Sequence, residues 1–563
     1  MTKKQVSGFC TLTMLILTIA AANTVAQAQF SLLYSFNNTP PTSDPLGFTF
    51  PGTIAQGQDG NVYSTSPNGG SQQFNAGSVF SMSQTGTLLV LHGFNPNTDA
   101  GCSSPWSGLT LGTDGNFYGA LASCTFGNGS GEVFSITPSG GLNLLYNFTG
   151  GSDGGQPITT PVEGSDGNFY GTTLVGGGVA NRGTIYKMTP AGSVTTLHAF
   201  DGTDGCGSYA PLVQGNDGNF YGMASSCGSN GLGVVFKVTP AGVYTVLRNF
   251  TGPNGAFPRG PLVLGSDGNF YGTTEQGGVG TSAFGIAFKI TPVGKLTVLH
   301  TFTSNSGDGY APEGMVQATD GNFYGVTSQG GTSPNCTNGA NNVCGTIFRI
   351  NSTGSSYAVL YNFDSTTGSL PEITLLQHTN GIFYGLATFG GTYNSGTFYS
   401  LNVGLGQFVR LVSTSGVVGA TVEILGQGFT GTKKVSFSGA SAAFSVVSDT
   451  YLTATVPGGA KTGNVTVTTP STTLKSSTKF RVTPQITTFN PPSGPVGTSV
   501  AITGVSLIQT SKVTFGGVKA TTVTRNSNTQ VTAIVPTGAK TGNIVITTAG
   551  GTATSPGIFT VTP

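Results

Sequence analysis

Charged side chains are scarce in this chain. Only 7% of its 563 residues are Asp, Glu, Lys or Arg, and the formal net charge is +1. Such a chain presents no basic field to attract phosphates and no acidic field to attract cations. We therefore expect no nucleic-acid partner.

Helix-favouring runs are equally rare after the N-terminal region. The sequence has 90 glycines, and short runs of Val, Ile, Phe, Tyr and Thr lie between turn residues. These residues favour strands, and the turn residues between them favour short connections. The pattern predicts an all-β protein.

The only long apolar run lies near the N-terminus. Lys3 and Lys4 precede an apolar run over residues 12–22, and Ala26-Gln27-Ala28 follows it. This order of charged, apolar and small residues is typical of a secretory signal peptide, predicted over residues 1–28. The run is shorter than the roughly 20 residues that span a bilayer. We expect a bacterial protein that is secreted or held at the cell surface, with no membrane span after signal removal.

One motif, Asp-Gly-Asn-Phe-Tyr-Gly or a close variant, recurs about every fifty residues. Its tyrosines are Tyr63, Tyr118, Tyr170, Tyr221, Tyr271, Tyr324 and Tyr384. A fixed period of this length is typical of repeat architectures such as β-propellers. Seven copies predict seven structural units.

The repeat over residues 211–250 shows what one unit contains. Asp217-Gly218 separates two β-like runs, as in a tight hairpin turn. Thr239-Pro240-Ala241-Gly242 separates two more and suits a type I turn. Four antiparallel strands joined by short turns make one propeller blade. We therefore predict a seven-bladed β-propeller over residues 29–405.

The fourth-strand pattern occurs once too often, because it also appears before the first repeat at residues 31–36. The last repeat ends after its third strand. We predict that the N-terminal strand 30–36 joins the last blade and closes the ring, which removes an open sheet edge.

A second repeat follows the propeller. Ser415-Gly416-Val417-Val418-Gly419 reappears as Ser493-Gly494-Pro495-Val496-Gly497, and other matches follow at shifts of 78 or 79 residues. The strand lengths and turn spacing suit immunoglobulin-like β-sandwiches. We predict two such domains, over residues 406–484 and 485–563.

Both regions resemble known families. Pro492-Ser493-Gly494, Gly497 and Phe515-Gly516-Gly517 are similar to an IPT/TIG domain, and residues 408–484 resemble a second copy. Gly-Ser-Asp-Gly-Asn-Phe-Tyr-Gly-Thr-Thr at 164–173 resembles the GloVer-type tandem repeats of exported bacterial proteins. The resemblance implies export and architecture, and it implies no particular activity.

Six cysteines follow the signal peptide. Cys102 and Cys124 flank one repeat tyrosine as Cys206 and Cys227 flank another, while Cys336 and Cys344 lie in the longest loop between second and third strands. An even cysteine set in an exported chain favours disulfides, and we expect the pairs Cys102–Cys124, Cys206–Cys227 and Cys336–Cys344. The alternative, a zinc site, usually needs closely spaced cysteine pairs or histidines.

These cysteines mark one end of the blades. The loops there differ in every repeat, whereas the Asp-Gly-Asn and Thr-Pro-x-Gly turns at the other end scarcely change. A ligand is selected by differences between loops, so we expect function at the variable end.

Two repeated residue types invite a metal interpretation. The motif aspartate is replaced by Asn380 in the seventh repeat, so the shared property is turn formation and not a calcium-binding carboxylate. His92, His198 and His300 occupy one fourth-strand slot in three blades, which favours half-buried strand residues over a metal triad. We expect no metal, no cofactor and no catalytic residue.

Charged and aromatic residues in the loops leave an enzyme as an alternative function. A propeller glycosidase would use paired carboxylates, and the loops and strand edges contain Glu132, Glu163, Glu275, Glu313 and Glu372. The candidate ligand-contacting residues are Trp106, Arg182, Arg259 and Tyr310. Exposed aromatics among these suit stacking on sugar rings, and the alternative is that they cap the apolar end of a blade.

The sequence therefore favours an exported, non-catalytic binding or adhesion protein. Its partner would be an extracellular polysaccharide or a surface protein, and the sandwiches would act as spacer or docking units. The alternative is an extracellular carbohydrate-active enzyme or a lectin-like accessory module.

Overall fold

The computed structural model describes residues 28–37, 44–47, 52–70, 75–99, 102–124, 130–280, 283–303, 307–333, 336 and 344–563, apart from the side chains at 102 and 124. The regular elements within these ranges are all strands, which confirms the all-β prediction. In these ranges no helix is long and apolar enough to cross a membrane. Residues 1–27 of the predicted signal peptide lie outside these ranges.

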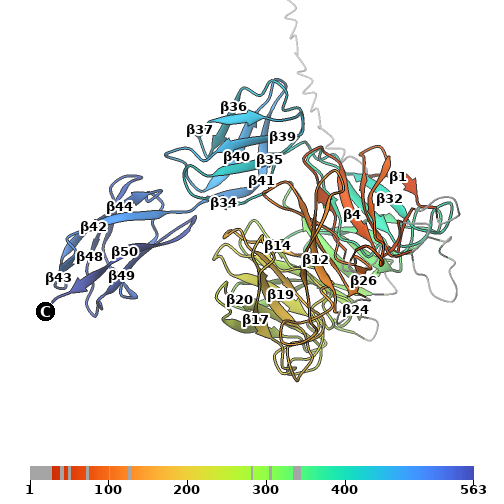
Figure 1. Cartoon of the computed structure of the whole chain (residues 1–563), viewed down its shortest axis with the longest axis horizontal. Helices are drawn as coiled ribbons and strands as arrows, with labels where there is room; N and C mark the ends of the chain where they lie inside the picture. The colour runs from red at the N-terminus through yellow and green to blue at the C-terminus, as the bar shows by residue number, and fades with distance from the viewer. Residues whose placement is uncertain are drawn as a thin grey trace, which may run out of the picture.

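Within the described residues, the repeat region forms seven four-stranded antiparallel sheets, one for each motif copy (Figure 1). Strands follow chain order across the first six sheets. The first strands of neighbouring sheets contact one another, as β18 (Val213–Gln214) contacts β22 (Val263–Leu264), so first strands form the inner edge. Repeated sheets of this kind fit propeller blades.

The first three sheets contain β3 (Ala55–Gln56), β4 (Val62–Ser66), β6 (Ser78–Met82), β7 (Leu88–Gly93); β9 (Thr110–Leu111), β10 (Phe117–Leu121), β12 (Glu132–Ile136), β13 (Leu142–Asn147); β14 (Val162–Glu163), β15 (Phe169–Thr172), β16 (Thr184–Met188) and β17 (Val194–Ala199). The fourth to sixth contain β18, β19 (Phe220–Ala224), β20 (Val234–Val238), β21 (Tyr244–Asn249); β22, β23 (Phe270–Thr274), β24 (Ala283–Ile290), β25 (Leu296–Thr303); β26 (Tyr310–Gln317), β27 (Phe323–Gln329), β28 (Thr346–Ile350) and β29 (Tyr357–Asn362). Two-stranded ribbons pair β2 (Pro45–Leu46) with β5 (Asn68–Gly69) and β8 (Cys102–Ser103) with β11 (Ser123–Cys124).

The seventh sheet joins the two ends of the repeat region. It contains β30 (Leu376–Gln377), β31 (Phe383–Ala387), β32 (Thr397–Asn402) and the N-terminal β1 (Gln29–Ser35). Strand β1 pairs antiparallel with β32, with Phe30 opposite Leu401. The first strand of the chain thus fills the fourth place in the last sheet, where residues 30–36 were expected.

Residues of the repeated motif hold neighbouring sheets together. In the first five copies the motif tyrosine stacks on the phenylalanine of the next copy, as Tyr221 stacks on Phe270 with ring centroids 4.0 Å apart, and in the sixth Tyr324 packs tilted on Phe383. The motif glycine follows from the same packing, because a Cβ at Gly222 would lie 2.5 Å from the Phe236 ring. The period of the sequence is therefore the period of the core.

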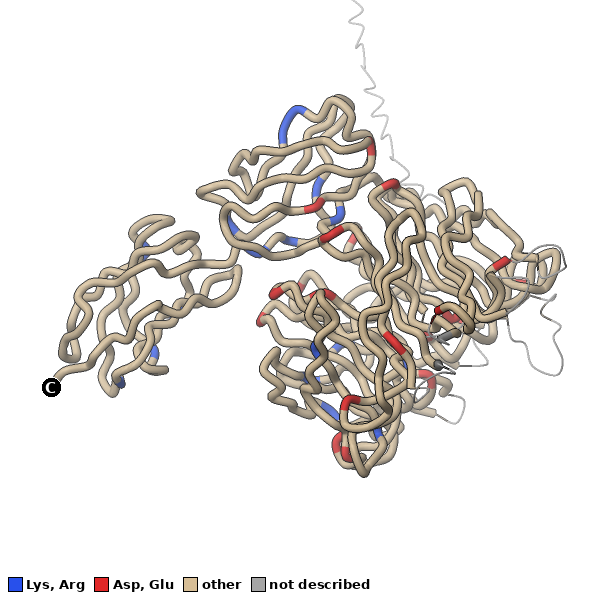
Figure 2. The backbone as a smooth tube through the Cα atoms, viewed as in Figure 1, with Lys and Arg blue, Asp and Glu red and all other residues tan. Residues whose placement is uncertain are grey.

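Two β-sandwiches follow the repeats. The first has sheets β33-β35-β39-β38 and β34-β41-β40-β36-β37, and the second repeats this order as β42-β44-β48-β47 and β43-β50-β49-β45-β46. Their equivalent cores include the edge-to-face pairs Phe437–Phe480 and Phe515–Phe559. Figure 1 and Figure 2 show the first sandwich beside the repeats and the second farther out. The predicted domain boundaries themselves stay predictions.

The sandwich strands are β33 (Arg410–Leu411), β34 (Ser415–Gly416), β35 (Thr421–Leu425), β36 (Lys434–Phe437), β37 (Ala440–Ala442), β38 (Phe444–Val446), β39 (Tyr451–Thr455), β40 (Gly463–Thr468), β41 (Thr473–Val482), β42 (Gln485–Asn490), β43 (Ser493–Gly494), β44 (Ser499–Val505), β45 (Lys512–Phe515), β46 (Val518–Lys519), β47 (Val523–Arg525), β48 (Gln530–Ile534), β49 (Gly542–Thr548) and β50 (Gly551–Val561).

Candidate functional site

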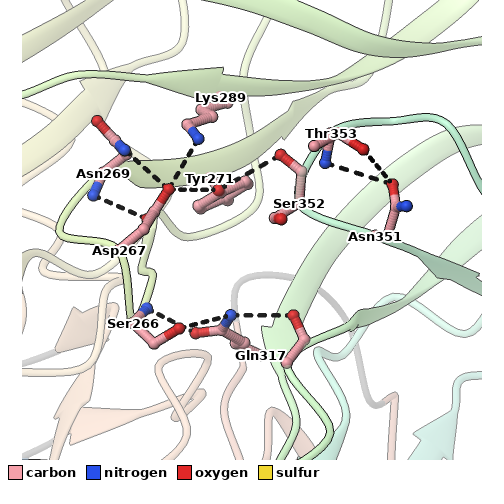
Figure 3. Close-up of polar contacts among 10 residues, drawn as sticks. Ser266, Asp267, Asn269, Tyr271, Lys289, Gln317, Asn351, Ser352 and Thr353 are labelled. Atoms are coloured by element: carbon pink, nitrogen blue, oxygen red, sulfur yellow. Dashed lines mark hydrogen bonds and ion pairs between the residues drawn. The ribbon is translucent and has the colours of Figure 1, made fainter.

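One end of the repeat region, the turn end, is built from the Asp-Gly-Asn turns. In the fifth repeat, Asp267 accepts hydrogen bonds from the Asn269 amide, from Tyr271 Oη at 3.0 Å and from Lys289 Nζ at 2.7 Å (Figure 3). Burial alone would raise the pKa of Asp267, but these hydrogen bonds lower it to about 2. The aspartate therefore serves its own turn, as the sequence interpretation predicted.

The turns are also linked around the inner edge. In five of the seven sheets, the side chain that ends the first strand accepts a hydrogen bond from the turn of the preceding blade, as Gln317 Oε1 does from the Ser266 amide at 2.8 Å (Figure 3). Gln56 and Thr379 make the equivalent link between the first and seventh repeats. Glu163 holds this slot in the third repeat and accepts from Thr113 N and Oγ1 at 2.8 and 2.6 Å.

The first sandwich docks on this turn end. Thr450 Oγ1 donates to the Gln58 carbonyl at 2.6 Å, and Arg481 Nη1 donates to the Gly215 carbonyl at 3.1 Å. Arg410 is half-buried and donates to the Gln377 carbonyl. Loss of solvent lowers the pKa of Arg410 to about 10. Three repeats therefore contribute to one domain contact.

A polar cavity of about 310 Å³ lies between the sandwich and the turns. Its lining includes Thr113, Glu163 and Gln214 from the repeats and Thr414 and Glu423 from the sandwich. Burial raises the pKa of Glu423, and nearby Glu163 raises it further. Burial also raises the pKa of Glu163, against its hydrogen bonds from Thr113. The cavity belongs to the domain contact.

The seventh turn explains why the motif aspartate is Asn380 there. His378 and Thr379 are fully buried, and the Thr379 carbonyl accepts from the Phe408 amide that leads into the sandwich. Asn380 Nδ2 donates to Gln84 Oε1 at 2.9 Å, which a carboxylate cannot do. Burial lowers the pKa of His378 to about 4. This turn is covered, so an uncharged residue suits it.

The three histidines lie on the fourth strands of three different sheets, and each has its own partner. Each Nε2 pairs with an aspartate of its own repeat: His92–Asp99 at 2.9 Å, His198–Asp204 at 2.7 Å and His300–Asp308 at 2.8 Å. Tyr146 makes the same contact to Asp153. Among the described residues, no three His, Cys, Asp or Glu side chains form a group that could hold a metal ion.

The opposite end, the variable end, carries the disulfides. Cys206–Cys227 and Cys336–Cys344 are bonded in the structure. The side chains of Cys102 and Cys124 lie outside the described part, although their backbones are opposite each other in the ribbon of β8 and β11. Two of the three expected disulfides are therefore present, and the third stays a prediction.

A left-handed residue precedes the inner strand at the variable end. Ser104, Gln156, Phe257, Ala311 and Leu370 have φ between 51° and 61°, and a proline follows each. Non-glycine residues rarely adopt this conformation, at a cost on the order of 1 kcal/mol each. The surroundings impose it: the Phe257 amide donates to the Leu232 carbonyl of the preceding repeat, and the Phe257 carbonyl accepts from the Glu275 amide.

This backbone conformation places two sets of side chains at the variable end. The inner ring, which we define as the position two residues after the left-handed one or its equivalent, contains Gly52, Trp106, Ile158, Tyr209, Arg259, Glu313 and Glu372. The second ring, four residues after each motif tyrosine, contains Pro67, Ala122, Leu174, Ser225, Glu275, Ser328 and Thr388. Both rings are apolar in the first three repeats apart from the indole N–H, and polar in the last four.

Charged members of the two rings converge. Arg259 Nη1 lies 3.3 Å from Glu275 Oε2, and the guanidinium lies 5.5 Å from the centroid of the Tyr209 ring. Thr388 Oγ1 donates to Glu372 Oε2 at 3.2 Å. Glu313 lies among these groups, because Glu372, Arg259 and Glu275 all act on its charge. Side chains from four neighbouring repeats thus form one cluster.

Glu313 is a buried carboxyl within this cluster. Its side chain is buried, with 2% of the residue exposed, and its Oε2 has no hydrogen-bond partner. Burial raises the pKa of Glu313 to about 8, and Glu372 contributes to the rise. Ser225 Oγ of the second ring is also buried without a partner. Buried polar atoms are normally hydrogen-bonded, so each of these two atoms lacks a partner that a ligand could supply.

The four ligand-contacting residues proposed from the sequence do not all lie in this cluster. Arg259 is in the cluster, and Trp106, 38% exposed, holds the equivalent inner-ring position. Arg182 Nη1 instead lies 3.8 Å from Cys227 Sγ, beside a disulfide. Tyr310 packs against Phe284 with centroids 5.3 Å apart.

Sequence reasoning missed Tyr209 and Ser225. Aligning the repeats on the proline before the inner strand would have found Tyr209, because Arg259, Glu313 and Glu372 follow such a proline directly. Ser208 replaces that proline in the fourth repeat, which hides the alignment.

No curated protein matches the chain in sequence. Similar solved structures include a putative 6-phosphogluconolactonase from Bacteroides uniformis, 16% identical over 58% of this chain and 88% of that one, with a TM-score of 0.40. A fungal alcohol oxidase in complex with copper is 12% identical over 81% and 99%, with a TM-score of 0.44. A surface glycan-binding protein from Prevotella bryantii is 19% identical over 27% and 41%, with a TM-score of 0.21. At these scores the likenesses support no inference about function.

Family models identify both parts of the chain. Residues 107–338 match the Gloeobacter/Verrucomicrobia repeat, and residues 408–482 and 484–561 each match the IPT/TIG domain. These matches agree with the sheet pattern, because the first range lies in the four-stranded sheets and the others cover the two sandwiches. The chain therefore combines Gloeobacter/Verrucomicrobia repeats with two C-terminal IPT/TIG domains.

Proposed function

We propose that this is an exported, non-catalytic binding protein whose ligand contacts the variable end of the repeat region. The ligand is an extracellular polysaccharide, and the IPT/TIG domains act as spacer or docking units. Two disulfides support an oxidising, extracellular setting.

The observation that carries this proposal is the cluster of Arg259, Glu275, Glu313 and Glu372 at the variable end. The first, third and fourth of these hold the inner-ring position and Glu275 holds the second-ring position, yet the residue types at both positions differ from blade to blade. Packing alone favours the same residue in every copy, as at the turn end. Departures from the repeat are therefore expected where a ligand selects them.

The first IPT/TIG domain supports the choice of end. It covers part of the turn end through Arg410, Thr450 and Arg481. The inner ring lies at the opposite end of the repeats, away from these contacts. A polysaccharide suits the inner ring because Trp106 is 38% exposed and Tyr209 lies beside the Arg259 guanidinium, so aromatic rings and hydrogen-bonding groups occur at the same end.

Retention on immobilised polysaccharides tests the proposal. The mature protein should be retained by at least one glycan of a broad panel, and Arg259→Ala should abolish retention. Lys289→Ala, which removes a cation at the turn end, is the matched control and should be retained as the parent is. Equal loss in both variants, or retention unaffected by Arg259→Ala and Trp106→Ala, would count against a site at the variable end.

One observation favours a second candidate, a carbohydrate-active enzyme. Glu313 has a raised pKa of about 8 and lies near Glu372, and a protonated carboxyl beside a carboxylate is the pairing that glycosidases use. Product analysis separates the two functions. Released sugars that disappear in Glu313→Gln would establish the enzyme, whereas retention without release supports the binding protein.

A further inference from the structure

Negative charge exceeds positive charge in the variable-end cluster. Glu275 and Glu372 are the acidic groups that act on the charge of Glu313, and Arg259 is the one basic group that does so. Arg259 is already in an ion pair with Glu275. An added cation would therefore offset the excess of carboxyl groups in the cluster.

Glu313 is the group that such a cation would meet. Its Oε2 is buried and has no partner, and desolvation keeps the carboxyl protonated at neutral pH. A buried carboxyl left in this state is stabilised when an opposite charge approaches, because the approach favours the ionised form. An ammonium group also supplies three hydrogen-bond donors.

The rest of the inner ring indicates what carries the ammonium group. Tyr209 and Trp106 present aromatic surfaces, and Ser225 Oγ offers a second buried polar atom without a partner. Flat aromatic faces next to scattered hydrogen-bonding atoms suit a ring that has both C–H faces and hydroxyls, such as a sugar. Metal ions suit the cluster less well, since no described trio of acidic, His or Cys side chains is close enough to ligate one.

We propose that the variable end binds a polysaccharide bearing free primary amines, with a sugar ammonium group paired to Glu313. The inference rests on the proposed binding function and names its ligand class. Upon binding, Glu313 loses its proton to solvent and forms the ion pair with the ammonium, so charge and protons balance without any other reactant. Glu372, Arg259, Glu275 and Ser328 are the groups that face Glu313.

Calorimetry with glucosamine oligosaccharides tests this inference directly. At pH 6 the amine is charged and Glu313 is neutral, so binding should release up to one proton per site, measured from titrations in two buffers of different ionisation enthalpy. N-acetylated oligosaccharides of the same length should bind about tenfold or more weakly, as expected for the loss of one charged hydrogen-bonded pair.

Glu313→Gln is the decisive variant because it keeps the shape of the protonated side chain. It should remove the proton release and reduce the preference for free amines about tenfold or more. Glu423→Gln changes a carboxyl at the opposite end and is the matched control, which should behave as the parent does. Circular dichroism of both variants confirms the fold before titration.

The outcomes separate this inference from the proposed function. Equal affinity for acetylated and free oligosaccharides, with Arg259→Ala weakening both, would overturn the amine inference and leave the binding function standing. Preference for a lysine-containing peptide over the amino sugar would also overturn it. Binding of no glycan in the panel would contradict both proposals.

Discussion

The two ends of the repeat region contrast in what their residues share. At the turn end, the same aspartate, asparagine and tyrosine recur and satisfy one another, as Asp267, Asn269 and Tyr271 do. At the variable end, a recurring left-handed backbone presents a different side chain in each blade, and buried polar atoms such as Glu313 Oε2 and Ser225 Oγ are left without partners. Residues shared by the repeats thus stabilise the fold, and residues that differ form the binding site that we propose.

The seventh turn sharpens this contrast. There the motif departs from aspartate because the first IPT/TIG domain and the first repeat cover it, burying His378 and Thr379. A departure at the turn end thus reports a domain contact. Departures at the variable end have no such cover in the described structure, which is why we assign them to a ligand.

The largest expected effect on stability is the pH response of Glu313. Its folded pKa, about 8, is above the ordinary 4.5, so the folded state holds the proton more tightly. The associated stability is fully present below about pH 4.5 and is lost as pH rises through 8. Each unit of pKa difference corresponds to about 1.4 kcal/mol.

The unfolding free energy should therefore fall less between pH 5 and pH 9 in Glu313→Gln than in the parent. The difference is at most about 1.4 kcal/mol for each unit by which folding raises the pKa of Glu313. Glu132, whose pKa burial raises to about 7, keeps part of the slope. Urea denaturation at a series of pH values measures it. An unchanged slope would show that Glu313 ionises freely.

The next effect concerns the disulfide at the variable end. Cys206 and Cys227 close a segment with a sequence separation of 21, and removing such a link typically costs about 3 kcal/mol. The double variant Cys206→Ala, Cys227→Ala should lower the unfolding free energy by about that much in denaturant titrations. Equal stability of the variant and the parent under oxidising conditions would argue against a structural disulfide.

A smaller effect distinguishes the covered turn from the exposed ones. Asn380→Asp removes the bond to Gln84 and places a charge in the covered turn, so we expect a loss of about 1–2 kcal/mol. Asp267→Asn is the reciprocal change in an exposed turn. It loses the surface ion pair with Lys289 and should cost under about 1 kcal/mol. Thermal unfolding of the two variants orders them, and the reverse order would contradict the covered-turn explanation.

Much of the fold could be predicted because the period is visible in the residues. The spacing of Asp217-Gly218, Tyr221 and Phe236 reflects one turn, one interblade stack and one close approach, and each repeats with the blade. The surplus N-terminal strand was visible for the same reason, since β1 carries a fourth-strand pattern. Local rules of this kind need no knowledge of the partner surface.

The candidate site was less predictable because it depends on contacts between blades. Arg259 was singled out, but its grouping with Glu313 and Glu372 needs the ring geometry, which brings residues more than fifty positions apart together. Docking of the IPT/TIG domain was invisible too. Arg410 and Arg481 bind main-chain carbonyls, and a carbonyl leaves no signature in the sequence.

Hydrogen exchange tests most directly whether the variable end is the binding end. With the most strongly retained glycan of the panel, we predict slower amide exchange at residues 257–260, 311–314 and 370–373, and no change at the turns 217–219 and 267–269. Protection at those turns with unchanged exchange before the inner strands would contradict the account.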